Sequence, residues 1–310
     1  MKIIICGATG FIGSHLLKHF DNEENDIFAI FNKRVPLKDT SNKVNWFKAD
    51  LRTPDSLKSI LKGTDLFLQF AATTSGSKDI IQRPYIHVTD NAVMNSYLLR
   101  QCFESQVGHF IFPSCTVMLQ SIDNQKESDW DQSAPINHNY FGVGNTKVYI
   151  EKMCNFYSNL GLKTTVIRHS NVYGPNDKFD LNKSHVLGAT IKKVKIAKEI
   201  GEIEVWGTGK AKRDFIYIDD LINFVEKAFA NQKRIYEIFN CGMGKSISIN
   251  DLVSLVIKIS GKSLKIVNDL KKPDIATALS LNCDKALKEI NWKAKTDLSK
   301  GIKKTYFSCP

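Results

Sequence analysis

The sequence contains no apolar run near the roughly 18 residues that a membrane-spanning helix needs, so we expect no transmembrane segment. Its first residues, Met1–Gly13, have too little positive charge and too short an apolar run for a signal peptide. The seven cysteines are scattered, with no CxxC pair and no histidine-rich cluster. This usage predicts reduced thiols, a cytoplasmic location and no metal site.

Acidic residues are scarce in one part of the chain. Residues 1–180 hold 19 basic and 18 acidic residues, whereas residues 181–310 hold 24 and 14, which accounts for most of the net charge of +11. The lysines are dispersed and are not interleaved with aromatics as in a groove that follows a nucleic-acid strand. We therefore expect no nucleic-acid partner. The basic excess indicates either an anionic ligand or a lysine-rich solvated surface.

Apolar runs alternate with segments of helical spacing through the first 170 residues. Strands are predicted at 2–6, 27–31, 66–72, 109–112 and 164–168, and helices at 14–20, 54–62, 88–105 and 144–160. This alternation predicts an α/β fold with a Rossmann-type, doubly wound parallel sheet.

The alternation weakens after Tyr173. A loop over 174–184 precedes a helix near 185–199, and shorter pieces follow irregularly. We expect a smaller, mixed α/β C-terminal portion that binds substrate. The predicted division gives residues 1–170, with about 212–240, to a dinucleotide-binding Rossmann portion. Residues 171–211 and 241–310 then form the substrate portion.

A glycine-rich turn follows the first predicted strand. It reads Gly7-Ala-Thr-Gly10-Phe11-Ile12-Gly13 and opens the first helix. Glycines there permit unusual backbone angles, a close approach to a pyrophosphate and tight packing of helix on strand. The strand–turn–helix context therefore predicts that these residues bind a dinucleotide rather than form a simple structural turn.

The end of the second predicted strand selects between the nicotinamide cofactors. An acid there binds the ribose 2′-hydroxyl of NAD, and a nearby cation accommodates the 2′-phosphate of NADP. This chain has Phe31 followed by Asn32, Lys33 and Arg34. The missing acid and the two cations favour NADP slightly, and NAD stays an alternative.

Several motifs together resemble the extended short-chain dehydrogenase/reductase family, of the nucleotide-sugar epimerase, dehydratase and reductase type. They are the glycine turn, Asp50-Leu51, Phe70-Ala71-Ala72, Ile167–Pro175, Lys212–Leu221 and Ile290–Trp292. The resemblance implies an NAD(P) cofactor and a nucleoside-diphosphate sugar. It also implies that Asp50 and Leu51 lie at the adenine, Ala71 and Ala72 under the cofactor, and His169 and Ser170 near the nicotinamide.

The segments Asn182–Val186, Lys272–Asp274 and Gly301–Tyr306 are most similar to the GDP-fucose synthase branch of this family. This similarity implies a GDP-linked hexose or heptose used for bacterial surface polysaccharide. Substrate-binding roles are implied for Ser114, Asn171, His185, Val186, Trp206, Arg213 and Lys272. Arg213 suits the sugar-nucleotide diphosphate, because a guanidinium can bind phosphate oxygens in pairs. Trp206 fits either the base pocket or a hydrophobic core.

The family's catalytic set is a Ser or Thr, a Tyr and a Lys four residues after the Tyr. Ser114 and Lys147 match it, but Val143 stands where the Tyr should be. A phenol needs a nearby cation to serve as a base near neutral pH, so this departure removes the usual proton relay. Three explanations are open: Tyr140 substitutes, another group such as Thr116, Cys115, His185 or water moves the proton, or catalysis is lost.

His185 is similar to a histidine that works with a cysteine in the fucose-synthase branch, but the cysteine position here is Thr116. Double epimerisation is therefore disfavoured, as is 4,6-dehydration, since no carboxylate or lysine follows Ser114. The leading expectation is oxidation or 4-keto reduction at the sugar C4. The alternatives are a C4 epimerase and a catalytically silent binding protein. By analogy with relatives, the helices near 88–105 and 144–160 would form a homodimer or higher oligomer.

Overall fold

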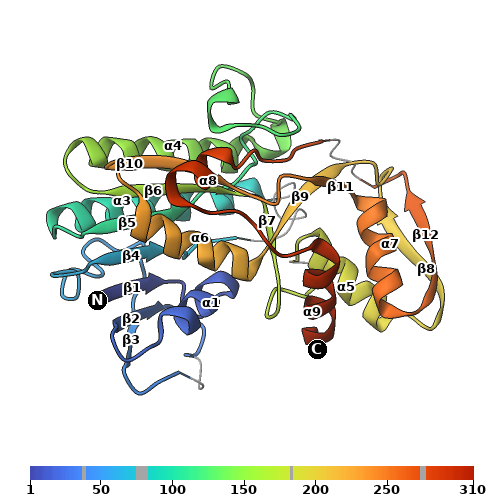
Figure 1. The fold of residues 1–310 in the computed structure, drawn as a ribbon, viewed down its shortest axis with the longest axis horizontal. Coiled ribbons are helices and arrows are strands. Elements are labelled where there is room, and N and C mark those ends of the chain that lie inside the picture. The colour runs from blue at the N-terminus through green and yellow to red at the C-terminus, as the bar shows by residue number, and fades with distance from the viewer. Residues whose placement is uncertain (37–39, 75–82, 182–183, 273–276) are drawn as a thin grey trace.

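The centre of the molecule is a parallel sheet (Figure 1). The computed structural model describes residues 1–36, 40–74, 83–181, 184–272 and 277–310. Within these residues the sheet has seven strands in the order β10-β6-β5-β4-β1-β2-β3. They are β1 (Lys2–Cys6), β2 (Asp26–Phe31), β3 (Val44–Lys48), β4 (Leu66–Gln69), β5 (His109–Pro113), β6 (Thr164–His169) and β10 (Tyr236–Cys241). The predicted doubly wound sheet is confirmed.

Helices cover both faces of this sheet. They are α1 (Phe11–Phe20) and α6 (Ile218–Asn231) on one face, and α3 (Thr89–Glu104) and α4 (Phe141–Asn159) on the other. Alternate residues of β1 serve the two layers: Ile3 and Ile5 pack with the α1 and α6 side, and Ile4 and Cys6 with the α3 and α4 side. Because both faces are buried, the strands are continuously apolar, which is the pattern that the sequence showed.

A smaller portion with its own sheets extends from the strand ends. A three-stranded sheet and a parallel pair form it, with β7 (Asn171–Tyr173), β9 (Lys212–Tyr217) and β11 (Ser246–Ser248) in the first and β8 (Ile200–Trp206) and β12 (Ser263–Asp269) in the second. Its helices are α5 (Val186–Ile196), α7 (Ile249–Ser260), α8 (Asp284–Ile290) and α9 (Leu298–Ser308). The smaller mixed portion is thus confirmed. The exact domain boundaries stay a prediction, since β9 pairs within the small sheet whereas β10 belongs to the large one.

Three short 3-10 helices complete the described elements: η1 (Pro84–His87), η2 (Glu127–Asp129) and η3 (His138–Tyr140). No helix among the described residues is both long and apolar enough to cross a membrane.

The helix predicted at 54–62 is wrong, because this segment forms successive turns. Asp55 has a left-handed φ of 54°, which interrupts a right-handed helix. The backbone N–H of Leu57 donates to Gln101 Oε1 at 3.1 Å instead of to a helical carbonyl. The N–H of Lys58 reaches back only three residues, to the carbonyl of Asp55. Leu57, Ile60 and Leu61 of this segment are buried against α3 without forming a regular helix.

Candidate active site

The glycine turn forms a cradle made of backbone. Gly7 has a φ of 74°, and a Cβ there would lie 2.7 Å from the carbonyl oxygen of Phe70. A Cβ on Gly13 would overlap the carbonyl oxygen of Gly7. Gly10 precedes α1 and offers no side-chain cap, so the first N–H groups of that helix are left for an anion. The cradle therefore fits the pyrophosphate of a dinucleotide.

Two cations lie beside this cradle. Asn32, Lys33 and Arg34 follow β2 and are exposed. The Arg34 guanidinium donates a long hydrogen bond of 3.5 Å to the carbonyl oxygen of Thr9, inside the glycine turn. Lys33 is close enough to Asp50 for its charge to help lower the pKa of that carboxyl. The end of β2 is thus positive where an acid would face an NAD ribose.

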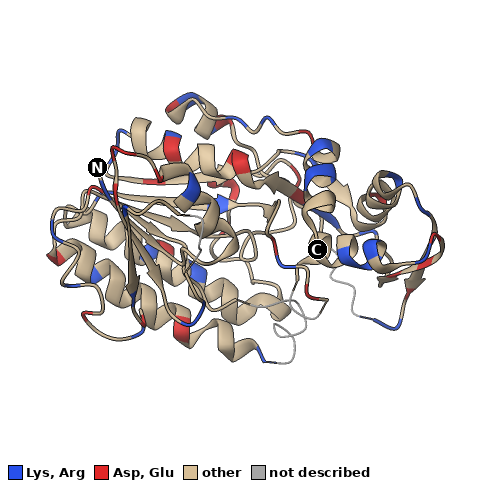
Figure 2. Ribbon diagram, turned by 90° about the horizontal axis from the view of Figure 1, so that it is seen from below, with Lys and Arg blue, Asp and Glu red and all other residues tan. Residues whose placement is uncertain are grey.

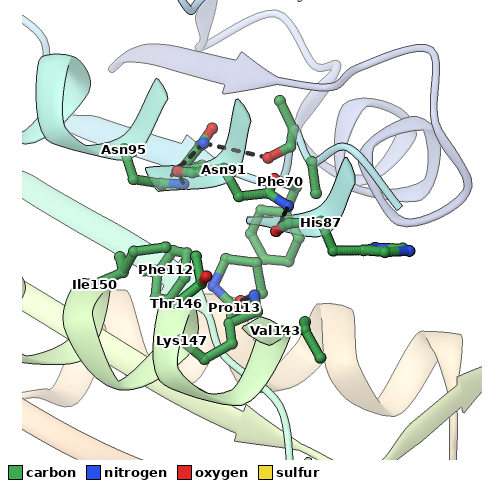
Figure 3. A pocket seen from close by; sticks show the side chains of 13 residues that line it. Phe70, His87, Asn91, Asn95, Phe112, Pro113, Val143, Thr146, Lys147 and Ile150 are labelled. Atoms are coloured by element: carbon green, nitrogen blue, oxygen red, sulfur yellow. Dashed lines mark hydrogen bonds between the residues drawn. The ribbon is translucent and has the colours of Figure 1, made fainter. Parts of the chain in front are cut away.

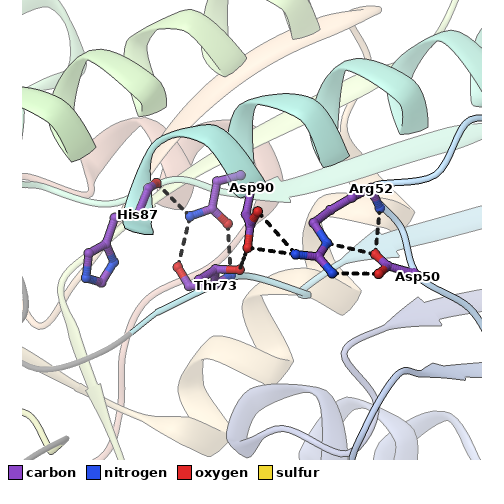
Figure 4. A network of polar contacts seen from close by, with 6 residues as sticks. Asp50, Arg52, Thr73, His87 and Asp90 are labelled. Carbon is purple, nitrogen blue, oxygen red and sulfur yellow. Dashed lines mark hydrogen bonds and ion pairs between the residues drawn. The ribbon is translucent and has the colours of Figure 1, made fainter. Parts of the chain in front are cut away.

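Asp50 belongs to a chain of charged groups (Figure 4). Arg52 donates to both of its carboxylate oxygens, at 2.9 and 2.6 Å. These hydrogen bonds lower the pKa of Asp50 to about 2. Arg52 also pairs with Asp90 at the start of α3, at 3.2 Å, and Asp90 in turn accepts from Thr73 Oγ1 at 3.1 Å. The network ties the loop after β3 to the loop after β4.

Asn91 extends the same region towards η1. Its amide nitrogen donates to the carbonyl oxygens of Thr73, at 2.9 Å, and His87, at 2.8 Å, while its oxygen accepts from the Thr73 N–H at 3.0 Å. One side chain therefore holds the loop after β4 and the end of η1 in a fixed relation. Such fixed loops position functional groups precisely.

A small pocket of about 40 Å³ lies where β4 and β5 end (Figure 3). Its lining residues come from β4 and the loop after it, η1, α3, β5 and α4: Gln69, Phe70, Ala71, Ala72, His87, Asn91, Asn95, Phe112, Pro113, Val143, Thr146, Lys147 and Ile150. The Lys147 ammonium donates to the Pro113 carbonyl at 2.8 Å. Burial lowers the pKa of Lys147, and the nearby acidic and thiol groups oppose that change. Val143 lies one helical turn before it, so the phenol of the family motif is absent from this wall.

Two buried polar atoms of predicted cofactor-side segments have no hydrogen-bond partner among the described residues. Gln69 Oε1 lines the pocket, and Ser170 Oγ lies just after β6. A buried polar atom without a partner is costly, so a bound polar group would satisfy them. Ala71 and Ala72 follow β4 along the same wall, and Leu51 is buried below the Asp50 loop.

Ser114 faces away from the pocket. It is fully buried and donates to Glu151 Oε1 at 2.5 Å. Glu151 also forms a buried ion pair with Arg168, at 2.8 Å, and Trp130 covers that guanidinium with its ring centre 4.4 Å away. The catalytic role of Ser114 stays a prediction, but its hydroxyl here supports the network that joins β5, α4 and β6.

Tyr140 contacts Arg213, which belongs to β9 of the smaller portion. Burial raises its pKa, while the charge and hydrogen bond of Arg213 oppose that rise. Arg213 also donates to the carbonyl of Thr277 at 3.1 Å and to the Thr277 hydroxyl. Cys115 lies within electrostatic reach of both Tyr140 and Lys147, and burial raises the pKa of its thiol. Thr116, the next residue, is half-buried.

Two of the predicted site histidines have lowered pKa values. Burial lowers the pKa of His169 to about 4, and its Nδ1 lies 2.8 Å from the carbonyl of Ser170. His185 precedes α5. Desolvation of its ring lowers its pKa, and the charges of Lys178 and His87 lower it further. Both imidazoles are therefore neutral at neutral pH.

The remaining predicted substrate residues lie on the smaller portion. Asn171 donates to the Asp214 carbonyl at 3.0 Å, and Val186 begins α5. Trp206 ends β8, is 44% exposed, and has the Lys272 ammonium 5.6 Å from its ring centre. Its exposure disfavours the hydrophobic-core alternative. Residues 182–183 and 273–276, which complete two of the resembling segments, lie outside the described residues.

A family model described as "NAD dependent epimerase/dehydratase family" matches residues 3–242 of the chain. The chain belongs to this family. Its resemblance to extended short-chain dehydrogenase/reductase enzymes is confirmed, as is the expectation of an NAD(P)-dependent enzyme of the nucleotide-sugar class.

Relatives in this family match the chain from end to end. A GDP-L-colitose synthase of Yersinia pseudotuberculosis is 26% identical and covers 98% of this chain and 96% of its own. A GDP-L-fucose synthase of Sinorhizobium fredii is 27% identical, covering 99% and 95%. A UDP-glucuronic acid 4-epimerase from Bacillus cereus, solved with UDP-glucuronic acid and NAD, has a TM-score of 0.85 at 26% identity over 99% and 98% of the two chains.

Sequence reasoning missed four residues in or beside this pocket: His87 and Asn91, which line it, and Glu151 and Arg168, which form the buried ion pair. Glu151 follows Lys147 by four residues, so one helix face carries both, and that spacing could have revealed it. His87 and Asn91 are also four apart, but the first lies in a 3-10 helix before α3. The residue roles assigned from the resemblance stay predictions.

Proposed function

We propose that the chain is an oxidoreductase acting at C4 of a nucleoside-diphosphate sugar, by oxidising the alcohol or reducing a 4-keto sugar. The observation that supports this most is that the glycine turn adjoins the pocket that contains Lys147. Phe70 and Ala71 lie against Gly7 of the turn and also line that pocket. A GDP-linked hexose or heptose is favoured, because two GDP-sugar synthases match nearly the whole chain.

The cofactor end has a separate set of tasks. The glycine turn binds the pyrophosphate, and Lys147 is placed to hold the nicotinamide ribose. When bound, the nicotinamide supplies hydride exchange with the sugar carbon. Lys33 and Arg34 favour NADP, because their charges complement a 2′-phosphate beside the turn.

The substrate end is positive. Arg213 is half-buried, and its guanidinium suits the diphosphate of a sugar nucleotide. Lysines and arginines are frequent along the smaller portion (Figure 2), which contains most of the chain's excess positive charge. This charge attracts an anionic sugar nucleotide. We place the reaction in the cytoplasm, as part of surface-polysaccharide synthesis.

The test is a native mass spectrum of the purified protein, followed by turnover assays with GDP-, UDP-, CDP- and dTDP-sugars. Bound NAD or NADP, and turnover that is greatest with a GDP-sugar or its 4-keto form, are the expected results. Cofactor binding with no turnover of any sugar nucleotide would instead support a silent binding protein, which the absent phenol at Val143 favours.

A C4 epimerase is the second candidate, because the structural likeness to the UDP-glucuronic acid 4-epimerase spans the chain. The two activities differ in their product. An epimerase releases an inverted sugar without net change of cofactor, whereas the oxidoreductase changes NAD(P)H absorbance in proportion to product.

We also propose a homodimer formed by α3 and α4. These helices pack side by side on one face of the sheet. Four large apolar side chains of α4 and its end point to solvent: Phe141, Tyr149, Phe156 and Leu160. Their spacing places them along one stripe, which a second copy would cover. Sedimentation velocity should report a dimer, and Phe156→Asp should shift it towards monomer, while Phe307→Asp, exposed on α9, should not.

A further inference from the structure

The missing phenol leaves the proposed oxidoreductase without its usual proton carrier. Tyr140 accepts a hydrogen bond from Arg213, the residue to which the proposed function assigns the diphosphate. Ser114 points to Glu151 inside the protein. The pocket wall around Val143 and Lys147 therefore needs another group that can exchange a proton near neutral pH.

We propose that His87 is the proton-transfer residue that replaces the absent tyrosine. His87 lines the same pocket as Val143 and Lys147. Figure 3 shows its ring and the Val143 side chain on the same side of that pocket. An imidazole has an ordinary pKa of about 6.5, so unlike a phenol it needs no cation to act as a base at neutral pH. This inference rests on the proposed C4 chemistry.

The surroundings hold His87 in place against α4. A Cβ on Gly142 would lie 2.9 Å from Val88 Cγ2, so the residue after His87 packs directly on the first turn of α4. Asn91 fixes the His87 carbonyl at 2.8 Å and also holds Thr73. The side chain is only 4% exposed. Buried, tethered groups of this kind are preorganised for proton transfer.

One proton and one hydride are transferred in each direction of the proposed reaction. In the oxidation the sugar C4 O–H bond breaks and its proton goes to an imidazole nitrogen of His87, while the C4–H bond breaks and its hydride passes to the oxidised nicotinamide. In the reduction the His87 imidazolium returns the proton to the C4 oxygen as hydride arrives at C4. Lys147 keeps its place at the ribose and takes no part in the proton transfer.

Two titratable groups near His87 come from other elements: Lys147 of α4 lines the same pocket, and His185 lies ahead of α5. His87 lowers the pKa of His185 through its charge, which shows that the two rings are within electrostatic reach. His185 is thus the competing candidate, and the experiment must separate them.

The first measurement needs no turnover. The imidazole resonances of the ¹⁵N-labelled protein are followed through a pH titration with NAD⁺, with NADP⁺ and alone, and His87 is assigned by its loss in His87→Gln. A positive nicotinamide beside His87 should lower its pKa by about one unit. A titration that cofactor leaves unmoved overturns the inference alone. Binding of neither cofactor overturns it together with the proposed function.

The second measurement uses variants in the assay with the preferred sugar nucleotide. His87→Ala should lower kcat by about 10²–10⁴-fold with little change in KM, and remove the acid limb of the pH profile. Val143→Tyr in the His87→Ala background restores a phenol four residues before Lys147 and should recover much of kcat. His19→Gln, an exposed histidine on α1, is the matched control.

These variants also separate His87 from His185. Unchanged kcat in His87→Ala, with loss in His185→Gln, assigns the proton to His185 and overturns the inference. A lowered kcat that Val143→Tyr fails to recover, with the pH profile unchanged, shows a structural role for His87 and overturns it as well. Cofactor affinity of His87→Ala, measured by protein fluorescence, confirms that the variant is folded.

Discussion

The glycine turn and the pocket at the start of α4 are built from different material. At the glycine turn the ligand site consists of backbone, since Gly7 and Gly13 leave no room for a side chain. At the start of α4 the pocket consists of side chains from β4, η1, α3, β5 and α4, which meet only in the folded chain. The turn follows its family closely, and the pocket has lost the phenol at Val143.

This difference indicates which parts of such an enzyme can accept substitutions. A backbone cradle tolerates few substitutions, because any Cβ meets another backbone atom. Side chains around a pocket can exchange roles while the supporting framework stays, and the Glu151–Arg168 pair with Ser114 is that framework here. The comparison therefore predicts large stability effects in the buried framework and smaller, selective effects at the exposed edge of the cofactor site.

The largest effect is expected for Arg168→Met. The pair it forms with Glu151 is buried, with side chains only 2% and 3% exposed, so the variant leaves an uncompensated carboxylate. We expect the free energy of unfolding to fall by about 3–5 kcal/mol in urea titrations.

The double variant Arg168→Met/Glu151→Met supplies the control for this prediction. It removes both charges and should recover most of the loss, because a buried ion pair and an apolar pair of similar size are often comparable in stability. A single variant as stable as the original chain would show that the pair is not the framework of the site.

A second effect concerns Asp214, which joins β9 to two loops of the substrate side. Its carboxylate accepts from the N–H groups of Met243, Gly244 and Leu281 at 3.0–3.1 Å, yet burial raises its pKa to about 6. The folded chain thus binds this proton more tightly than the unfolded chain, whose ordinary value is 3.8. Stability contributed by Asp214 is therefore greatest below pH 4 and falls by up to about 3 kcal/mol as pH rises to 6.

Urea unfolding at intervals between pH 4 and pH 7 measures this slope. Asp214→Asn cannot titrate, so the difference between the two unfolding curves should change over that window and be constant above about pH 6.5. Asp177 has a pKa also raised to about 6 by burial, and Asp177→Asn is therefore the matched comparison. A difference that is independent of pH would place the Asp214 carboxyl at its ordinary pKa.

The same comparison explains what the sequence could predict. The order of strands and helices, and the glycine turn, follow from local spacing, since apolar periodicity and glycine positions directly reflect backbone geometry. The helix prediction for 54–62 was wrong because the apolar residues there have helical spacing. In the structure the Leu57 N–H instead donates to the side chain of Gln101, 44 residues away. Local spacing carries no information about such a long-range bond.

Side-chain direction was the harder part of the site. Ser114 matches its family motif, but whether it faces the pocket depends on the pleat at the end of β5 and on Glu151, 37 residues later. His87 belongs to no sequence motif that would indicate a function. Its position in the pocket depends on the packing of η1 against α4. Val143 and Lys147, by contrast, were correctly placed together because one helix carries both.

The smallest effect is expected at the exposed cations of the cofactor end. Lys33→Ser/Arg34→Ser should reduce the preference for NADP⁺ over NAD⁺ by about tenfold, equivalent to about 1.4 kcal/mol, and leave the NAD⁺ affinity nearly unchanged. The effect is modest because both side chains are exposed and screened by salt, so it should shrink further between 50 and 500 mM salt. Lys58→Ser, which removes an exposed lysine from the turns after β3, is the control. If the double variant keeps its preference, the 2′-phosphate is recognised by the backbone of the cradle rather than by these side chains, and the division between a backbone-built and a side-chain-built end extends to cofactor choice.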